Sequence, residues 1–114
     1  MSSHSDRLKI VRECYRAYET GDRSLIEPHL SVDFTFYSPD DVGIDRATYF
    51  ERCWPNSKLI EMFNFERLID LGDEVLVTYE VKKKGGGRFR NTEIQTFDGD
   101  KICKVEVYYG WDLK

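Results

Sequence analysis

Side chains near the end of the chain alternate between two faces over two successive runs, residues 90–97 and 101–111. Asp98-Gly99-Asp100 separates the runs and is a hairpin signal, so the pattern predicts two paired strands. One face carries Asn91, Glu93, Gln95 and Phe97 in the first run and Val105, Val107 and Tyr109 in the second. If these faces coincide, the Glu93 carboxylate lies on an otherwise apolar concave surface, where the chain has the means to do chemistry.

Along the rest of the chain, the spacing of hydrophobic positions is first typical of helices and then typical of strands. After a polar tail (residues 1–5), the predicted helices are 6–20, capped by Ser5, 22–26, capped by Asp22, and 46–54, capped by Asp45 and ended by Pro55. The predicted strands are 32–37, 59–71, 74–82, 88–97 and 101–111, with a turn-rich loop at 38–43. Because short links join the last four strands, we expect an antiparallel sheet after the helices and an α+β fold.

Composition sets the class of protein. At 114 residues and 40% hydrophobic, the chain is large enough for one domain with its own core. A net charge of −4 with interspersed signs gives no reason to expect nucleic acid or an anionic membrane as partner. The sequence shows no signal peptide and no long apolar run, so we expect a cytoplasmic protein. Its three cysteines lack metal-binding spacing, which predicts free thiols and no metal site.

The one basic cluster surrounds a triple-glycine turn and consists of Lys82, Lys83, Lys84, Arg88 and Arg90. We interpret it as a solvated hairpin tip whose charges protect the strand edges from pairing with another chain. A role in binding nucleic acid would require aromatic platforms between the charges, and only Phe89 is present there.

Four stretches follow one another in a recognisable order: 10–18 with Gly21-Asp22, 33–36 with Pro39, 97–102, and 108–111. Over nearly the whole chain this order resembles the NTF2-like superfamily, in particular SnoaL-like domains and relatives of ketosteroid isomerase. The resemblance implies a single domain over residues 1–114, with three N-terminal helices packed on a strongly curved antiparallel sheet that encloses a pocket as a cone. It also implies no cofactor and a homodimer formed through the outer face of the sheet.

The resemblance carries over to the catalytic positions only in part. Ketosteroid isomerase uses an aspartate base, and a tyrosine and a protonated aspartate that bind the developing oxyanion. The base position falls on Ser38, which cannot remove a carbon-bound proton unaided, and the tyrosine position falls on Cys14. The protonated acid falls on Glu93, while Asp40 is displaced by two residues from the base position. We therefore do not expect the standard ketosteroid isomerase mechanism.

Glu93, Tyr15 and Tyr18 are the residues expected to do chemistry. The residues expected to contact a ligand are Cys14, Phe36, Ser38, Asp40, Trp54, Gln95, Val107, Tyr109 and Trp111. In an apolar pocket the ionised form of a carboxyl is disfavoured, so the pKa of Glu93 should rise toward neutral pH. The alternative is a structural Glu93 that pairs with Arg90 or Lys104, or that hydrogen-bonds Tyr15 or Tyr18.

Two functions fit these residues. The first is a cofactor-independent isomerase- or cyclase-type enzyme that transfers protons on a small, apolar carbonyl or polyketide-like substrate. The second is a non-catalytic module that binds a hydrophobic ligand or serves dimerisation. A third hypothesis, a hydrolase, needs a second acidic group beside Glu93, for which Asp40, Asp41 and Glu106 are the options. The resemblance does not choose among them, because one fold hosts many activities.

Overall fold

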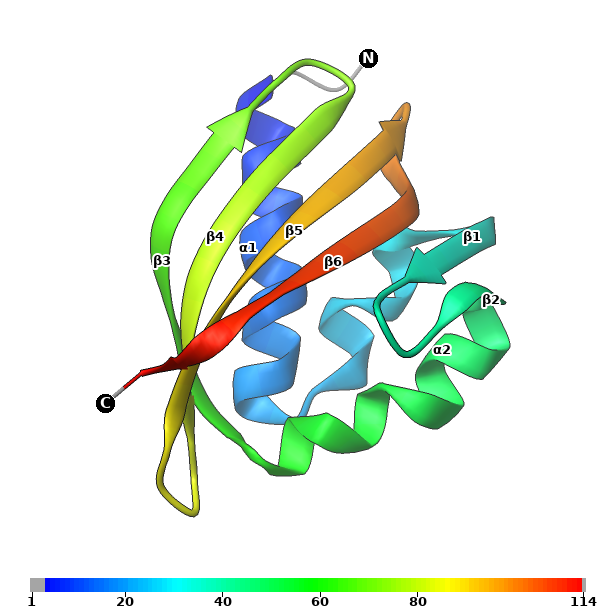
Figure 1. The fold of residues 1–114 in the computed structure, drawn as a ribbon. Coiled ribbons are helices and arrows are strands. Elements are labelled where there is room, and N and C mark those ends of the chain that lie inside the picture. The colour runs from blue at the N-terminus through cyan, green and yellow to red at the C-terminus, as the bar shows by residue number, and fades with distance from the viewer. Residues whose placement is uncertain (1–3, 114) are drawn as a thin grey trace.

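A computed structural model describes the backbone of residues 4–113 and the side chains of residues 6–113. The helical elements are α1 (His4–Thr20), η1 (Arg23–Leu25), η2 (Glu27–His29), α2 (Arg46–Arg52) and η3 (Trp54–Lys58), where η denotes a 3₁₀ turn. The strands are β1 (Leu30–Tyr37), β2 (Val42–Asp45), β3 (Ile60–Asp70), β4 (Glu74–Lys83), β5 (Arg88–Asp98) and β6 (Lys101–Leu113). Helices followed by a long meander of strands make the α+β class that the sequence predicts (Figure 1).

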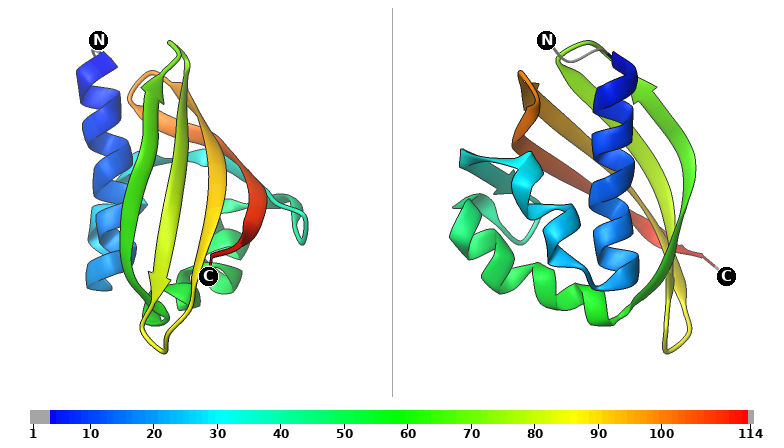
Figure 2. Two further views of the ribbon diagram at one scale, coloured as in Figure 1. Left: turned by 60° about the vertical axis from the view of Figure 1, so that its left-hand side comes forward. Right: turned by 180° about the vertical axis from the view of Figure 1, so that it is seen from behind.

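All the strands form one sheet, in the order β2-β1-β6-β5-β4-β3, which curves strongly around α1 (Figure 2). Within the β5–β6 hairpin, Glu93 stands opposite Val107 and Gln95 stands opposite Val105. Directly opposed residues of an antiparallel pair project from the same face. The predicted coincidence of the two faces is therefore confirmed, and it places Glu93 on the concave side of the sheet.

The sheet differs from the prediction at its other end. β1 pairs with β6 in parallel, so the sheet is mixed rather than antiparallel. Residues 42 and 43, predicted as loop, belong to β2, which pairs antiparallel with β1 at the sheet edge. Parallel neighbours need a long crossover connection, and here everything from β2 to β5 separates β1 from β6 along the chain. Short-range pattern does not reveal a pairing of that kind.

The helices also differ from the prediction in detail. α1 begins at His4, so Ser5 lies within the helix and is not its cap, while residues 1–3 of the predicted tail lie outside the described residues. The predicted second helix, 22–26, is the 3₁₀ turn η1 in place of an α-helix, and a second 3₁₀ turn, η2, follows it. Pro28 is accommodated because it stands at the start of η2, where no backbone N–H is needed. Instead of three N-terminal helices, the described chain has two α-helices with short 3₁₀ turns.

Two of the predicted helix caps are confirmed. Asp22 accepts a hydrogen bond of 3.0 Å from the backbone N–H of Ser24, at the start of η1. Asp45 accepts one of 2.8 Å from the backbone N–H of Thr48, at the start of α2. α2 ends at Arg52, two residues before its predicted end, and the chain continues directly into η3.

The core lies between α1, α2 and the concave face of the sheet. Its fully buried side chains come from α1 and the sheet and include Val11, Phe34, Val75, Val77, Val81 and Ile102, while α2 contributes the buried rings of Tyr49 and Phe50. The valines of β4 alternate with outward residues, as the strand period requires. In the described part of the chain, no helix is long and apolar enough to span a membrane.

The basic hairpin between β4 and β5 is tied to the surface of the sheet by ion pairs. Lys82 pairs with Glu61 at 3.0 Å, Arg90 pairs with Glu66 at 2.9 Å, and Arg88 pairs with Glu80. Such exposed pairs contribute little to stability. The solvated hairpin tip agrees with our interpretation of the cluster, but the predicted protection of strand edges is wrong. β4 and β5 are each paired on both sides, and the edges of the sheet are β2 and β3.

Gly110 of β6 approaches the backbone of β5 more closely than any side chain permits. The ladder between these strands is irregular from Phe89 to Asn91, and a Cβ at Gly110 would lie 2.0 Å from the carbonyl oxygen of Arg90. Gly110→Ala must therefore displace backbone, and we expect a loss of about 1–3 kcal/mol in the free energy of unfolding, measured with urea. Gly85→Ala is the control, because a Cβ there meets nothing within 4 Å. Equal losses in the two variants would contradict the close approach.

Candidate functional site

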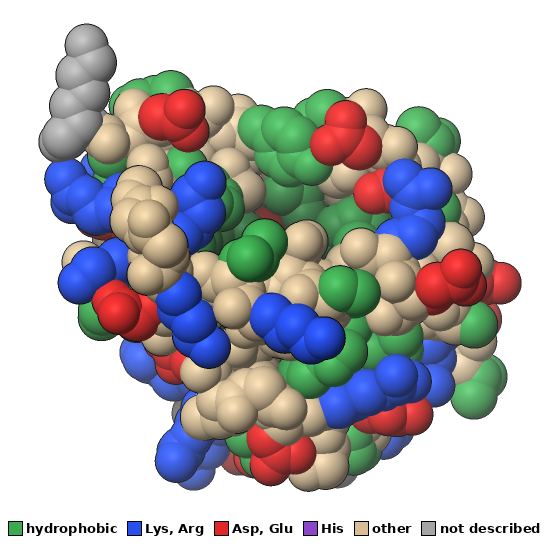
Figure 3. All heavy atoms as spheres, turned by 90° about the horizontal axis from the view of Figure 1, so that it is seen from below, with side chains coloured by type: hydrophobic (Ala, Val, Ile, Leu, Met, Phe, Trp, Pro, Cys, Tyr) green, Lys and Arg blue, Asp and Glu red, His purple; other side chains and the backbone are tan. Residues whose placement is uncertain are grey.

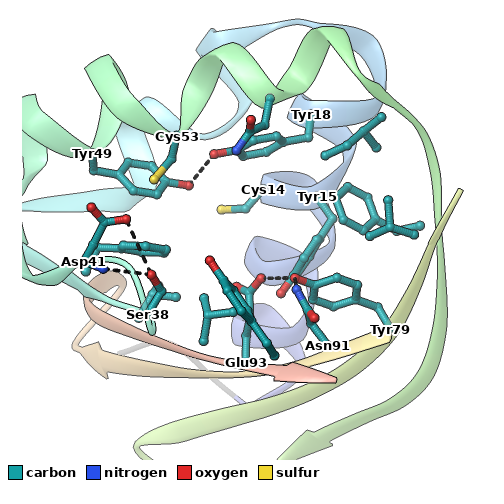
Figure 4. Close-up of a pocket in the computed structure, with 18 of the residues that line it drawn as sticks. Cys14, Tyr15, Tyr18, Ser38, Asp41, Tyr49, Cys53, Tyr79, Asn91 and Glu93 are labelled. Carbon is teal, nitrogen blue, oxygen red and sulfur yellow. Dashed lines mark hydrogen bonds between the residues drawn. The ribbon is translucent and has the colours of Figure 1, made fainter. Parts of the chain in front are cut away.

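A cavity of about 630 Å³ lies between the concave face of the sheet and the helices. Figure 3 shows one end of the molecule, with a hollow lined by hydrophobic side chains and with Lys and Arg gathered beside it. Side chains from α1, β1, β5 and β6 meet around the cavity (Figure 4). The predicted site residues among its lining are Cys14, Tyr15, Tyr18, Phe36, Ser38, Asp40, Glu93, Gln95, Val107, Tyr109 and Trp111.

Trp54 was also predicted to contact a ligand, but it is not part of the cavity lining. Its ring packs edge-on against the ring of Tyr18, with 5.0 Å between centroids. The reason is that α2 ends at Arg52 and Trp54 opens η3, so it no longer follows the helical stripe from which the prediction came.

Glu93 is surrounded by protein, although some of its surface still faces the cavity. Burial raises the pKa of its carboxyl, while hydrogen bonds from neighbouring side chains partly oppose that rise. The predicted ion pairs are wrong, since Arg90 pairs with Glu66 at 2.9 Å and Lys104 pairs with Glu106 at 3.5 Å. Glu93 is therefore a buried carboxyl for which no salt bridge is found in the described part of the chain.

Two tyrosines and two amides surround the Glu93 carboxyl. The Tyr79 hydroxyl donates to Glu93 Oε2 at 2.5 Å, and the Tyr15 hydroxyl also hydrogen-bonds the carboxyl. The Gln95 side-chain N–H donates to the Tyr15 oxygen at 3.1 Å, and the Asn91 side-chain N–H donates to the Tyr79 oxygen at 3.4 Å. The predicted alternative of a Tyr15 contact is thus present, and the partner that sequence reasoning missed is Tyr79.

A second polar group lies on the opposite wall. The hydroxyls of Tyr18 on α1 and Tyr49 on α2 are 2.6 Å apart and share one hydrogen bond (Figure 4). Burial raises the pKa of both hydroxyls, so both keep their protons at neutral pH. The pair has two protons and uses one internally, which leaves one O–H donor for a ligand.

Cysteine thiols complete the interior of the site without being reactive. Cys14 lies between the two tyrosine groups, and Cys53 lies beside Tyr49 (Figure 4). Burial raises the pKa of the Cys14 thiol far above its ordinary value and that of Cys53 to about 11. A thiol that stays protonated is a poor nucleophile. Both thiols therefore serve as lining rather than as catalytic groups.

The outer part of the cavity is polar and held by the loop after β1. Asp41 forms an ion pair of 2.7 Å with Arg52, and the Tyr109 hydroxyl donates to Asp40 at 2.8 Å. The Ser38 hydroxyl oxygen accepts hydrogen bonds from the backbone N–H groups of Asp40 and Asp41, at 3.1 and 3.2 Å. Ser38, at the base position of the resemblance, is therefore committed to holding the turn.

The residues that sequence reasoning missed are Tyr49, Tyr79 and Asn91. Tyr79 interrupts a row of inward-facing valines on β4, and a single hydroxyl in such a row is a signal for a polar partner. The alternation of side chains correctly put Asn91 on the same face as Glu93, but Asn91 was not predicted to belong to the site. Tyr49 offered no signal beyond its place in an apolar stripe, because its partner Tyr18 is 31 residues away. Among the described residues, no group of three His, Cys, Asp or Glu side chains is arranged to hold a metal ion.

The raised pKa of Glu93 makes stability depend on pH. The folded protein binds this proton more tightly than the unfolded chain, so the contribution is full below the ordinary glutamate pKa of about 4.3 and is lost as pH rises through the folded-state value. We expect the Tm of wild type to fall relative to that of Glu93→Gln as pH rises from about 4 to about 8. Thermal melts of both proteins across this range measure the difference. A difference that stays constant would contradict the raised pKa.

Solved structures match the chain along most of its length. An NTF2-like protein of unknown function from Cytophaga hutchinsonii is 16% identical, with a TM-score of 0.74, and the match covers 91% of this chain and 89% of that one. A candidate ketosteroid isomerase from Kribbella flavida is 12% identical, with a TM-score of 0.78 and coverage of 96% and 82%. AclR, a candidate hydroxylase from Streptomyces galilaeus, is 20% identical, with a TM-score of 0.78 and coverage of 95% and 77%.

These similarities define the fold. No protein-family model and no curated protein sequence matches the chain. At such low sequence identities, the structural similarity shows the fold and does not show the activity. The chain has the NTF2-like, SnoaL-like fold that its sequence predicts.

Proposed function

We propose that the protein binds a small, mainly apolar carbonyl compound in its cavity and transfers protons on it without a cofactor. The proposal rests on one observation: a carboxyl and a hydroxyl donor lie on opposite walls of an apolar cavity. On one side lies a buried carboxyl, Glu93, whose pKa is raised by burial. On the other lies the Tyr18–Tyr49 pair, with one O–H donor to spare. A base facing a hydrogen-bond donor is the arrangement that enolisation requires.

The chemistry follows from these two groups. The ligand carbonyl oxygen accepts the spare hydrogen bond of the tyrosine pair, and the ionised Glu93 removes a proton from the neighbouring carbon. The electron pair of the broken C–H bond forms the enolate, whose charge on oxygen the tyrosine donor stabilises. Glu93 then returns its proton to the same carbon or to a conjugated one, so that atoms and charge balance and no electron is gained or lost. Isomerases and cyclases of the aldol type use such a step.

This mechanism is not that of ketosteroid isomerase. Ser38 holds the base position of the resemblance, and its hydroxyl oxygen is occupied by two backbone N–H groups. Asp40 accepts from the Tyr109 hydroxyl, at the outer end of the cavity. We propose instead that Glu93 serves as the base, from the position that the resemblance gives to the protonated acid.

The hydrolase hypothesis finds little support. A second carboxylate beside Glu93 would be needed to activate water, and the acidic groups proposed for it have other partners. Asp41 pairs with Arg52 at 2.7 Å, and Asp40 binds Tyr109 at 2.8 Å. Glu106 stands opposite Ile94, on the outer face of the sheet, and pairs with Lys104.

The alternative function is a non-catalytic module that binds a hydrophobic ligand. One observation favours it: Glu93 already accepts hydrogen bonds from two tyrosines, which is also how a buried structural carboxyl is satisfied.

For assembly, we propose a homodimer through the outer sheet face, where Ile69 and Tyr108 are 44% and 52% exposed. Light scattering of the purified protein gives its mass, and a monomer at all concentrations would exclude the dimer.

Deuterium exchange separates the two functions. The probe is β-tetralone, an apolar bicyclic ketone whose benzylic carbon next to the carbonyl is a carbon acid. Proton NMR in deuterated water follows loss of the signal from that carbon, with and without protein. Exchange that is faster than the buffer background supports proton transfer. Saturable binding of the ketone without added exchange would replace the enzyme with the binding module.

A further inference from the structure

Asn91 and Gln95 flank Glu93 on the same face of β5, each two residues away along the strand. Each directs a side-chain N–H to a tyrosine that in turn contacts the Glu93 carboxyl. Gln95 reaches Tyr15 of α1 at 3.1 Å, and Asn91 reaches Tyr79 of β4 at 3.4 Å. The Gln95 side chain also hydrogen-bonds the Glu93 carboxyl directly. The result is a network in which an amide backs each tyrosine that contacts the carboxyl. It was not foreseen from the sequence, because it joins the β4–β5 hairpin to α1, which is distant along the chain.

The direction of each hydrogen bond follows from the protons and lone pairs that the hydroxyl and amide groups have. A tyrosine hydroxyl has one proton, and an amide NH₂ group has no lone pair with which to accept it. When the hydroxyl oxygen accepts from the amide, its own proton is left for the carboxyl. The orientation of Asn91 is fixed independently, because its Oδ1 accepts a hydrogen bond of 3.1 Å from the backbone N–H of Gly110. Its NH₂ group must therefore face Tyr79.

The burial of Gln95 is a second observation about the orientation of an amide. Its side chain is 3% exposed, and no partner is found for its Oε1 among the described residues. A buried carbonyl without a donor is a cost that folded proteins generally avoid. An apolar side chain of similar size would avoid that cost, so we explain the position of Gln95 by what its NH₂ group donates to Tyr15 and to the Glu93 carboxyl. Reversing the amide would draw the Tyr15 proton away from Glu93.

We propose that Asn91 and Gln95 are positioning residues, which act through Tyr79 and Tyr15 to keep two O–H donors on the ionised Glu93 carboxyl. The proposal rests on the proposed function of Glu93 as the proton-transfer group. Those donors oppose the rise that burial causes in the pKa of the carboxyl, and so favour the ionised form, which is the form that removes a proton from carbon. The amides thus keep a buried acid usable as a base.

The other groups facing Glu93 do not supply this effect. From α1 they are Cys14 and Tyr18, and from α2 and the turn after it they are Tyr49 and Cys53. All four stay neutral at neutral pH, since burial raises the pKa of each. Asp41 and Arg52 also line the cavity and form an ion pair of 2.7 Å, and no charged group is among the causes that shift the pKa of Glu93. Hydrogen bonding is therefore the means by which this site favours the ionised carboxyl.

The test follows the titration of Glu93 directly, by NMR of glutamate carboxyl carbons in isotope-labelled protein. The Glu93 signal is identified by its absence in Glu93→Gln. In Gln95→Met, which keeps the side-chain size and removes the donor, we expect the titration midpoint to move to higher pH. Thr96→Val is the matched control, because it makes a polar-to-apolar change next door on the opposite face of β5. Its midpoint should stay at the wild-type value.

Asn91→Leu provides an independent variant at a half-buried position, and it should move the midpoint in the same direction. An unchanged or lowered midpoint in the folded variants would overturn the proposal. β-Tetralone exchange adds a readout that a structural role would not move. Exchange by Gln95→Met should be several-fold slower than wild type at neutral pH and should recover at higher pH, whereas a packing defect would slow it at every pH. A moved midpoint in a protein that exchanges nothing would retain the positioning role and reject the proposed function.

Discussion

Replacing Glu93 by glutamine is expected to slow deuterium exchange on β-tetralone by about 10²- to 10⁴-fold, down to the buffer background. Glutamine has the same length as glutamate and still accepts a hydrogen bond from Tyr79 or Tyr15. It cannot take up a proton at neutral pH, so the base is lost while the shape of the cavity is kept. The exchange rate per bound ketone, with the Kd measured separately by titration, separates loss of chemistry from loss of binding.

Glu106→Gln is the matched control for this experiment. It removes the same charge from the neighbouring strand, but on the outer face, where Glu106 pairs with Lys104 at 3.5 Å. Exchange by this variant should equal that of wild type. If Glu93→Gln exchanged as fast as Glu106→Gln, the carboxyl would have no part in the chemistry, and Glu93 would be a structural residue.

The strand that carries Glu93 was predictable from the sequence because local rules decide it. The Asp98-Gly99-Asp100 turn predicts the hairpin, and alternation sets which side chains of one strand share a face. The turn pairs Asp98 with Lys101, and this register, if continued, would put Glu93 opposite Glu106. A register shift between Thr96 and Phe97 brings Val107 opposite Glu93 instead, and alternation alone does not reveal that shift. The same alternation sends Lys104 outward from a neighbour such as Val105, so its proposed pairing with Glu93 contradicted the pattern that placed Glu93 itself.

The partners of Glu93 were less predictable because they depend on tertiary packing. Tyr15 and Gln95 are 80 residues apart, and their contact exists only because α1 crosses the concave face of the sheet. The Tyr18–Tyr49 pair depends on where α2 lies after the β1–β2 hairpin, and the second strand of that hairpin was not predicted. Trp54 was misplaced for a related reason: a helical stripe was extended over residues that form a 3₁₀ turn.

The Tyr18–Tyr49 pair leads to a prediction about non-additive effects. Tyr18→Phe leaves the Tyr49 hydroxyl with its proton free, and Tyr49→Phe leaves that of Tyr18. Each single variant therefore retains one O–H donor in the same part of the cavity, and we expect exchange to slow by about tenfold or less. The double variant has no donor for the enolate oxygen. We expect its exchange to slow by about 10²- to 10³-fold, the usual cost of removing one oxyanion donor.

The double variant thus loses more than the product of the two single losses, because the pair acts as one donor and not as two. Exchange rates of the four proteins at one pH, together with their Kd for the ketone, give the coupling. Tyr37→Phe is the control for removing a hydroxyl, since Tyr37 ends β1 with 37% of its surface exposed and is not part of the cavity lining. Two single losses that multiply to the double loss would mean that each hydroxyl contacts the ligand separately. The ligand would then carry two oxygens on this wall, and the single-carbonyl mechanism would have to be replaced.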